Sequence, residues 1–214
     1  MKALVAPDIE AYATAHSIPE SEVCRLLREE THRQTDCPQM LVGPLEGGFL
    51  KMLTHIVGAT HVLEVGTFTG YSALCLAEAL PKKGTVTTCE IDETSAAIAR
   101  RYFARSPHGH KITVRLGPAL ETLHAINGRY DVIFIDADKQ NYLNYYRRAK
   151  ELLSPNGVIV IDNVLWDGDV LLNPPPDDRT AAIQELNRAV ASDSDVSAVL
   201  LTIRDGVLLV RRKA

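Results

Sequence analysis

The spacing of hydrophobic positions changes near residue 60. In the segment 18–34 apolar residues recur every three or four positions, which predicts an amphipathic helix, and a second helix is predicted over 44–57. After residue 60, short runs rich in β-branched residues alternate with helical patterns in five successive strand–helix pairs. We therefore expect one domain, 1–214, in which helices over 1–58 form a cap or an oligomer surface before an α/β core over 60–214.

The strand patterns predict a mostly parallel sheet. The runs VIFID (132–136) and VIVID (158–162) are apolar on both faces, which is typical of parallel strands between two helix layers. Tyr145, in the helical pattern between them, is expected in the core or at a dimer surface. The chain ends in two more strand patterns around Asp205-Gly206, a dipeptide that favours a hairpin. We expect seven strands, parallel except for an antiparallel C-terminal hairpin, with helices on both faces.

Composition and charge exclude several classes of function. With 46% hydrophobic and 23% charged residues among 214, the chain is typical of globular proteins and unlike disordered or collagen-like sequences. The 23 basic and 27 acidic residues give a formal net charge of −4, so neither nucleic acid nor an anionic membrane is an expected partner. No apolar stretch reaches the roughly 18 residues of a membrane span, and the N-terminus lacks a secretory pattern, so we expect a cytoplasmic protein. The four cysteines have no C-x-x-C spacing, and we expect reduced thiols.

The end of the first core strand carries a glycine-containing loop. Gly66 and Gly70 let the backbone approach a ligand, but Phe68 stands where a dinucleotide-binding loop needs its second glycine. Glu90 closes the second strand and can accept hydrogen bonds from ribose hydroxyls, which suits NAD and S-adenosylmethionine equally. Glu64 can pair with the ammonium of a zwitterionic ligand and would repel a pyrophosphate. The loop therefore favours S-adenosylmethionine; the alternative is that Glu64 and Gly66 only shape a turn.

Oxygen-bearing side chains end the fourth and fifth strands. Asp136 ends one, and Asp162 and Asn163 end the other. If the strands are neighbours, about 4.8 Å apart, these three oxygen donors meet and describe a Mg²⁺-type site; the alternative is that the acids cap the following helices. Lys139 returns one helical turn toward this cluster, where a lysine with a lowered pKa can act as general base, unless it is a solvated surface group. Asp138 is expected to face the cofactor or to orient the loop.

These motifs resemble those of the class I S-adenosylmethionine-dependent O-methyltransferases of the cation-dependent catechol and caffeoyl-CoA type. The segments LEVGTFTGYSA, CEID, FIDADKQNY and VIDNVLW followed by Asp167-Gly168 are similar to that family's motifs, in order, within about 20–214. The resemblance implies a Rossmann-like class I methyltransferase sheet, S-adenosylmethionine, Mg²⁺ or another divalent cation such as Mn²⁺ or Ca²⁺, and usually a homodimer. It implies cofactor contacts from Val42, Glu64, Gly66, Thr67, Tyr71, Ser72, Glu90, Ala119, Asp136 and Asp138. It implies cation ligation by Asp136, Asp162 and Asn163, Lys139 as the base, and Trp166 and Asp167 at the substrate.

Departures from the family pattern bear on the substrate. Val42 stands where plant CoA-ester enzymes tend to have Thr, and Asp167 where they tend to have Asn, so a CoA thioester is not expected. Asp138 stands where animal catechol enzymes carry an aromatic residue. We predict methyl transfer to one hydroxyl of a vicinal dihydroxy aromatic; the alternatives are an NAD(P)-dependent oxidoreductase and a non-catalytic S-adenosylmethionine-binding module. The loop 166–178 with its three prolines is expected as a substrate wall or, equally, a stiff surface connection.

Overall fold

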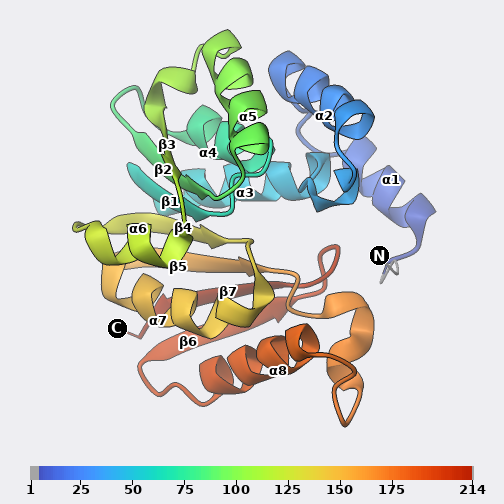
Figure 1. Ribbon diagram of the computed structural model, residues 1–214, viewed down its shortest axis with the longest axis vertical. Helices are drawn as coiled ribbons and strands as arrows, with labels where there is room; N and C mark the ends of the chain where they lie inside the picture. Colours follow the sequence, from blue (N-terminus) through green and yellow to red (C-terminus); the bar gives the residue numbers. More distant parts are fainter. Residues whose placement is uncertain (1–4, 214) are drawn as a thin grey trace.

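The strand–helix pairs form a seven-stranded sheet in the computed structural model, which describes residues 5–213 (Figure 1). The strands are β1 (His61–Val65), β2 (Thr85–Glu90), β3 (Ile112–Leu116), β4 (Tyr130–Ile135), β5 (Leu153–Asp162), β6 (Val196–Leu201) and β7 (Val207–Arg212). Their order is β3-β2-β1-β4-β5-β7-β6; β1 to β5 are parallel, and β7 is antiparallel to β5 and β6. The predicted fold class is confirmed.

Helices cover both faces of the sheet (Figure 1). They are α1 (Pro7–Ala15), α2 (Glu22–Gln34), α3 (Pro44–Val57), α4 (Tyr71–Ala79), α5 (Glu93–Arg105), α6 (Ala119–Ala125), α7 (Tyr142–Leu152) and α8 (Asp178–Ala191), with 3-10 turns η1 (Pro38–Met40), η2 (Gly109–Lys111), η3 (Lys139–Asn141) and η4 (Trp166–Leu171). In β4, Val132 and Phe134 pack with α3, α4 and α5, while Ile133 and Ile135 pack with α6, α7 and α8. This explains why the strand is apolar on both faces.

The N-terminal helices agree with the sequence pattern except at one boundary. The bounds of α3 are those predicted, but α2 begins at Glu22 and not at residue 18, because Ser21 caps it by accepting from the backbone N–H of Cys24 at 3.3 Å. Helix α1 is a separate element that the spacing did not resolve. Helix α2 lies against α4 and α5, where the Tyr102 hydroxyl donates to the Leu26 carbonyl at 3.1 Å.

The C-terminal hairpin is present, but its turn is longer than the Asp205-Gly206 dipeptide. Leu201 pairs with Val207, so the turn spans 202–206. Within it the backbone of residues 205 and 206 accepts hydrogen bonds from Leu165 and Val164, in the loop after β5. These tertiary bonds hold the turn open, which the local sequence could not indicate.

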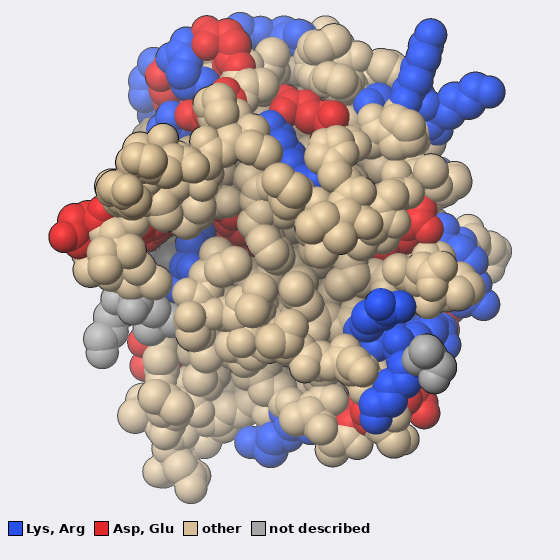
Figure 2. Space-filling model, turned by 180° about the vertical axis from the view of Figure 1, so that it is seen from behind, with Lys and Arg blue, Asp and Glu red and all other residues tan. Residues whose placement is uncertain are grey.

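The face of the molecule opposite to the one seen in Figure 1 shows no large patch of a single charge sign. Figure 2 shows that Lys and Arg lie mainly around the margin of this face with Asp and Glu among them, leaving a broad uncharged middle. In the described part of the chain, no helix combines the length and apolar character of a membrane span. The four cysteines are free, as expected.

Candidate active site

One cavity of about 900 Å³ opens at the carboxyl ends of the central strands. It lies where β1 and β4 are neighbours and the strand order reverses, which is the usual ligand position in an open α/β sheet. The non-glycine residues with positive φ in the described chain all line it: Phe68, Asn163, Trp166, Asp167 and Arg204. Because strained backbone concentrates at functional sites, this clustering supports an active site here.

Most of the predicted site residues meet in this cavity. It is lined by Val42, Gly66, Thr67, Tyr71, Ser72, Glu90, Ala119, Asp136, Asp138, Lys139, Asp162, Asn163, Trp166 and Asp167. Glu64 is not among the lining residues; it is fully buried, and its Oε2 accepts from the Thr88 hydroxyl. Burial raises the pKa of Glu64 to about 8, and its Oε1 has no hydrogen-bond partner among the described residues.

Gly66 brings the glycine loop and the end of β4 together. Its φ is 105°, and a Cβ there would lie 1.9 Å from the backbone oxygen of Asp136. The Asp136 N–H donates to the Val65 carbonyl at 2.9 Å, and the Gly66 N–H donates to the Cys89 carbonyl at 3.1 Å. Only glycine allows this approach, which sets the loop beside Asp136.

Glu90 fixes the same loop from the end of β2. Its Oε2 accepts from the Phe68 N–H at 2.6 Å, and its Oε1 accepts from the N–H groups of Ile91 and Asp92, both at 2.9 Å. A carboxylate oxygen has two acceptor sites, so Oε1 is filled by its two donors while Oε2 keeps one site for a ligand hydroxyl. Glu90 therefore shapes the turn and still offers one acceptor site to the cavity.

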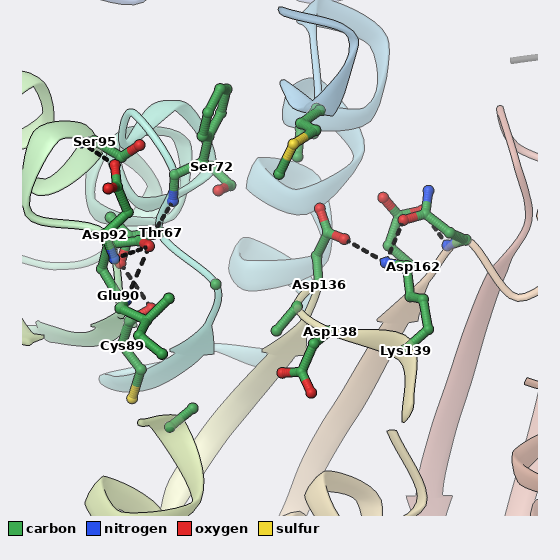
Figure 3. A pocket seen from close by; sticks show the side chains of 18 of the residues that line it. Thr67, Ser72, Cys89, Glu90, Asp92, Ser95, Asp136, Asp138, Lys139 and Asp162 are labelled. Carbon is green, nitrogen blue, oxygen red and sulfur yellow. Dashed lines mark hydrogen bonds and ion pairs between the residues drawn. The ribbon is translucent and has the colours of Figure 1, made fainter. Parts of the chain in front are cut away.

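The oxygen cluster forms at the other end of the cavity (Figure 3). Strands β4 and β5 are neighbours, and Lys139 Nζ lies 3.0 Å from Asp136 Oδ1 and 2.7 Å from Asn163 Oδ1. The same ammonium donates to the Tyr142 hydroxyl, which in turn donates to the Asp162 carbonyl at 3.1 Å. Lys139 is only 8% exposed, so this is a buried group and not a surface lysine.

The electrostatics of the cluster favour a cation. Burial and the neighbouring charge of Asp136 raise the pKa of Asp162 to about 7. Burial and the charge of Asp162 raise the pKa of Glu46, on α3, well above its usual range, while Arg204 opposes that shift. Two buried acids close to one another are stabilised by added positive charge.

The donor set fits a hard cation. The described chain contains no group of three or more His, Cys, Asp and Glu side chains placed to hold a metal ion. The predicted set instead combines the carboxylates of Asp136 and Asp162 with the amide oxygen of Asn163, which are the oxygen ligands that Mg²⁺ prefers. Three protein oxygens leave octahedral positions open to water or substrate.

The substrate side combines η4 with the hairpin turn. The Asp167 N–H donates to Asp205 Oδ1 at 2.6 Å, and Lys139 Nζ lies 5.6 Å from the centre of the Trp166 ring. The first residues of the loop 166–178 therefore form a wall of the cavity. Pro174 to Pro176 do not line it, which agrees with a surface connection for that part.

Tyr145 and Arg204 are among the cavity residues that the sequence did not predict for the site. Tyr145 belongs to the core as expected but also lines the cavity, where its hydroxyl donates to Asp138 Oδ1. Their separation of seven residues, two turns in a helical segment, was an available signal. Arg204 lines the cavity from the hairpin turn and contacts Leu41 and Val42. Leu41 and Val42 lie more than 160 residues away from Arg204 in the chain, and no local pattern could reveal these contacts.

Comparisons with known proteins agree with this geometry. Residues 14–213 match the model of the O-methyltransferase family. Caffeoyl-CoA O-methyltransferase 2 of Zea mays is 38% identical over 208 residues, 90% of this chain and 77% of that protein. The O-methyltransferase of Bacillus cereus in complex with SAH superposes with a TM-score of 0.89 at 33% identity, covering 96% of this chain and 97% of the other. TomG of Streptomyces achromogenes, an O-methyltransferase of tomaymycin synthesis in complex with SAM, has a TM-score of 0.89 at 29% identity, covering 97% and 96%.

The sheet and the placement of its cavity thus define a class I methyltransferase. The chain belongs to the O-methyltransferase family that includes the caffeoyl-CoA and catechol enzymes, and it is an S-adenosylmethionine-dependent O-methyltransferase. The predicted enzyme class is therefore confirmed, and the oxidoreductase and non-catalytic alternatives are not supported.

Proposed function

We propose that this protein methylates one hydroxyl of a vicinal dihydroxy aromatic in a reaction that requires a divalent cation. The observation that carries the proposal is the meeting of Asp136, Asp162, Asn163 and Lys139 at one end of the cavity whose other end holds the glycine loop and Glu90 (Figure 3). A cofactor site and a chelating site in one cavity are what methyl transfer to a catechol needs.

The cofactor end is proposed from the residues around the glycine loop. Glu90 Oε2 keeps one acceptor site for a ribose hydroxyl, and Ala119 is a small residue that leaves room for the adenine. Gly66 and Ser72 line the cavity beside the place of the amino-acid part, whereas the backbone N–H and the hydroxyl of Thr67 bond to the Cys89 carbonyl and so hold the loop in shape. The unpartnered Oε1 of Glu64 suits an ammonium, although the side chain lies outside the cavity lining. SAM and SAH in the complexes of two structural neighbours support a cofactor site in this fold.

The cation site is proposed from Asp136, Asp162 and Asn163. A divalent cation bound there would take two vicinal oxygens of the acceptor and favour ionisation of one hydroxyl. The protein contributes the fixed positions of its own oxygens: Asp162 is 2% exposed, and its backbone carbonyl accepts from Tyr142. A dry, preorganised donor set needs little rearrangement during the reaction.

Lys139 is proposed to hold and move the proton. Its Nζ is oriented by Asn163 and the Tyr142 hydroxyl, which lie on two different elements, so it is directed toward the cluster and away from solvent. In the transfer, the acceptor oxygen gains the methyl group as the carbon–sulfur bond of S-adenosylmethionine breaks and its electron pair stays on the sulfur of S-adenosylhomocysteine, while the hydroxyl proton passes to the lone pair of Nζ in its neutral amine form. Lys139 is then a general base, and the other residues align the two reactants.

The decisive experiment is a substrate panel with and without cation. Purified protein is incubated with S-adenosylmethionine, Mg²⁺ and ortho-dihydroxy aromatics, with monohydroxy aromatics and caffeoyl-CoA as further arms. We expect turnover of dihydroxy acceptors only, loss with a chelator and recovery on adding Mg²⁺. Equal use of the monohydroxy compounds would contradict chelation. Preferential use of caffeoyl-CoA would show that the substrate is a CoA ester, as in the plant enzymes.

We also propose a homodimer. Large apolar side chains are exposed on α1, α3 and β6, namely Ile9, Tyr12, Met52, Ile56, Val199 and Leu200. Apolar surface of this kind is often covered by a partner, and β6 is an edge strand of the sheet. Size-exclusion chromatography with light scattering tests this; a monomer mass at micromolar concentration would refute it.

A further inference from the structure

An arginine occupies a strained position in the hairpin turn beside the cavity. Arg204 has φ 46°, in the left-handed region that glycine adopts without strain and other residues rarely enter. A strained backbone of this kind is maintained only where the surrounding structure stabilises it. In Arg204 the side-chain contacts supply this stabilisation.

The Arg204 guanidinium joins the turn to the segment before α3. Its Nη1 donates to the carbonyls of Leu41, at 3.2 Å, and Val42, and to Glu46 Oε2 at 3.1 Å. The chain bends around this group at Gly43, whose φ is 81°. The Arg204 side chain thus donates to three acceptors in the segment 41–46, which forms no β-sheet hydrogen bonds.

Leu41 and Val42 form a wall of the cavity. Both are buried, at 6% and 5% exposure, and both line the cavity together with Arg204 and the glycine-loop residues. The segment that carries them, between η1 and α3, is irregular backbone. Without an external tether such a segment has several accessible conformations, and ordering it would oppose ligand binding.

The contact with Glu46 makes Arg204 hard to replace by another residue. Glu46 is fully buried, and its Oε1 has no hydrogen-bond partner among the described residues. Arg204 is the ion-pair partner of its other oxygen. Loss of the arginine would take this donor away from Glu46 Oε2, so it would disturb the first turn of α3 as well as the carbonyls before it.

We propose that Arg204 is a positioning residue for the methyl donor: it holds Leu41 and Val42 in place as one wall of the cofactor site. The proposal rests on the cofactor end of the cavity as assigned above. It predicts that the arginine contributes to the binding of S-adenosylmethionine more than to the chemical step.

The test measures binding of SAH, the demethylated cofactor, by titration calorimetry. Arg204→Gln removes the charged guanidinium group. Arg204→Gly removes the whole side chain but relieves the strained backbone, so this variant should fold. We expect both to bind SAH about tenfold more weakly, the effect of losing roughly one charged hydrogen bond. Arg204→Lys should recover part of the affinity. Arg211→Gln, an exposed arginine on β7 of the same hairpin, is the matched control and should bind like the wild type.

Kinetics and exchange separate positioning from general stability. In the Arg204 variants the KM for S-adenosylmethionine should rise about tenfold with kcat changed less than threefold, and the amides of residues 41–43 should exchange hydrogen faster. A lowered unfolding temperature with unchanged SAH affinity and KM would overturn the proposal. Failure of the wild-type protein to bind SAH would instead refute the cofactor site itself, so the two failures are distinguishable.

Discussion

Gly66→Ala offers the sharpest test of how the site is built. The new Cβ would lie 1.9 Å from the Asp136 backbone oxygen, far inside van der Waals contact, and φ 105° would strain any side chain. The backbone strain costs about 1–3 kcal/mol. Relieving the overlap requires β1 and β4 to separate at their carboxyl ends, which costs at least about 2 kcal/mol more and weakens the bond from the Asp136 N–H to Val65.

Gly128→Ala is the matched control for this variant. Gly128 has φ 123°, and a Cβ there meets nothing within 4 Å, so it incurs only the backbone strain. Urea unfolding of both variants should show Gly66→Ala to be less stable by at least about 2 kcal/mol, and only Gly66→Ala should lose SAH affinity. Equal stability of the two variants would refute the argument that the glycine is required by the approach of the two strand ends.

Three further predictions concern the buried ionisable groups. Lys139→Ala should lower turnover at least about 100-fold while SAH affinity stays near wild type; loss of SAH binding alone would show that Lys139 is not the base. Asp162→Ala should abolish activation by Mg²⁺ and weaken binding of Mn²⁺ followed by electron paramagnetic resonance, whereas Asp178→Asn, an exposed acid on α8, should change neither; retained cation dependence would contradict the assigned ligands. Burial raises the pKa of Glu64 to about 8 in the folded chain, against an ordinary value of 4.5, so the folded chain holds the proton more tightly. Its contribution to stability is therefore complete below about pH 4.5 and is lost as the pH rises through about 8. Glu64→Gln should flatten this dependence in urea unfolding at pH 5 and pH 8 without cofactor; an unchanged slope would show that another group causes it.

Local sequence predicted the fold because each element carries its own signal. The runs at 132–136 and 158–162 are apolar on both faces, and that pattern has few solutions other than a parallel strand between two helix layers. The site followed from the same logic, since parallel strands deliver their last residues to one edge. The sequence therefore predicts that Asp136, Asp162 and Asn163 lie together, and β4 and β5 are indeed neighbours.

The bounds of two elements differ from those that the sequence predicts. The Asp205-Gly206 dipeptide predicts a two-residue turn, but hydrogen bonds from residues 164 and 165 stretch it to 202–206. Helix α2 begins later than predicted for a local reason, because Ser21 caps it by accepting from the Cys24 N–H. In each case a specific hydrogen bond decided where the element ends or begins.

The sequence by itself determined the order of the elements, the class of sheet and the residues that reach its carboxyl edge, because hydrophobic periodicity and strand-end chemistry are local properties. Only the tertiary structure decided which distant groups face one another across that edge, as Arg204 does against Leu41, Val42 and Glu46. The physical reason is that burial and charge pairing depend on the whole packed chain. Glu46 and Arg204 are ordinary residues in the sequence, and only folding makes them a buried ion pair beside the predicted cation site.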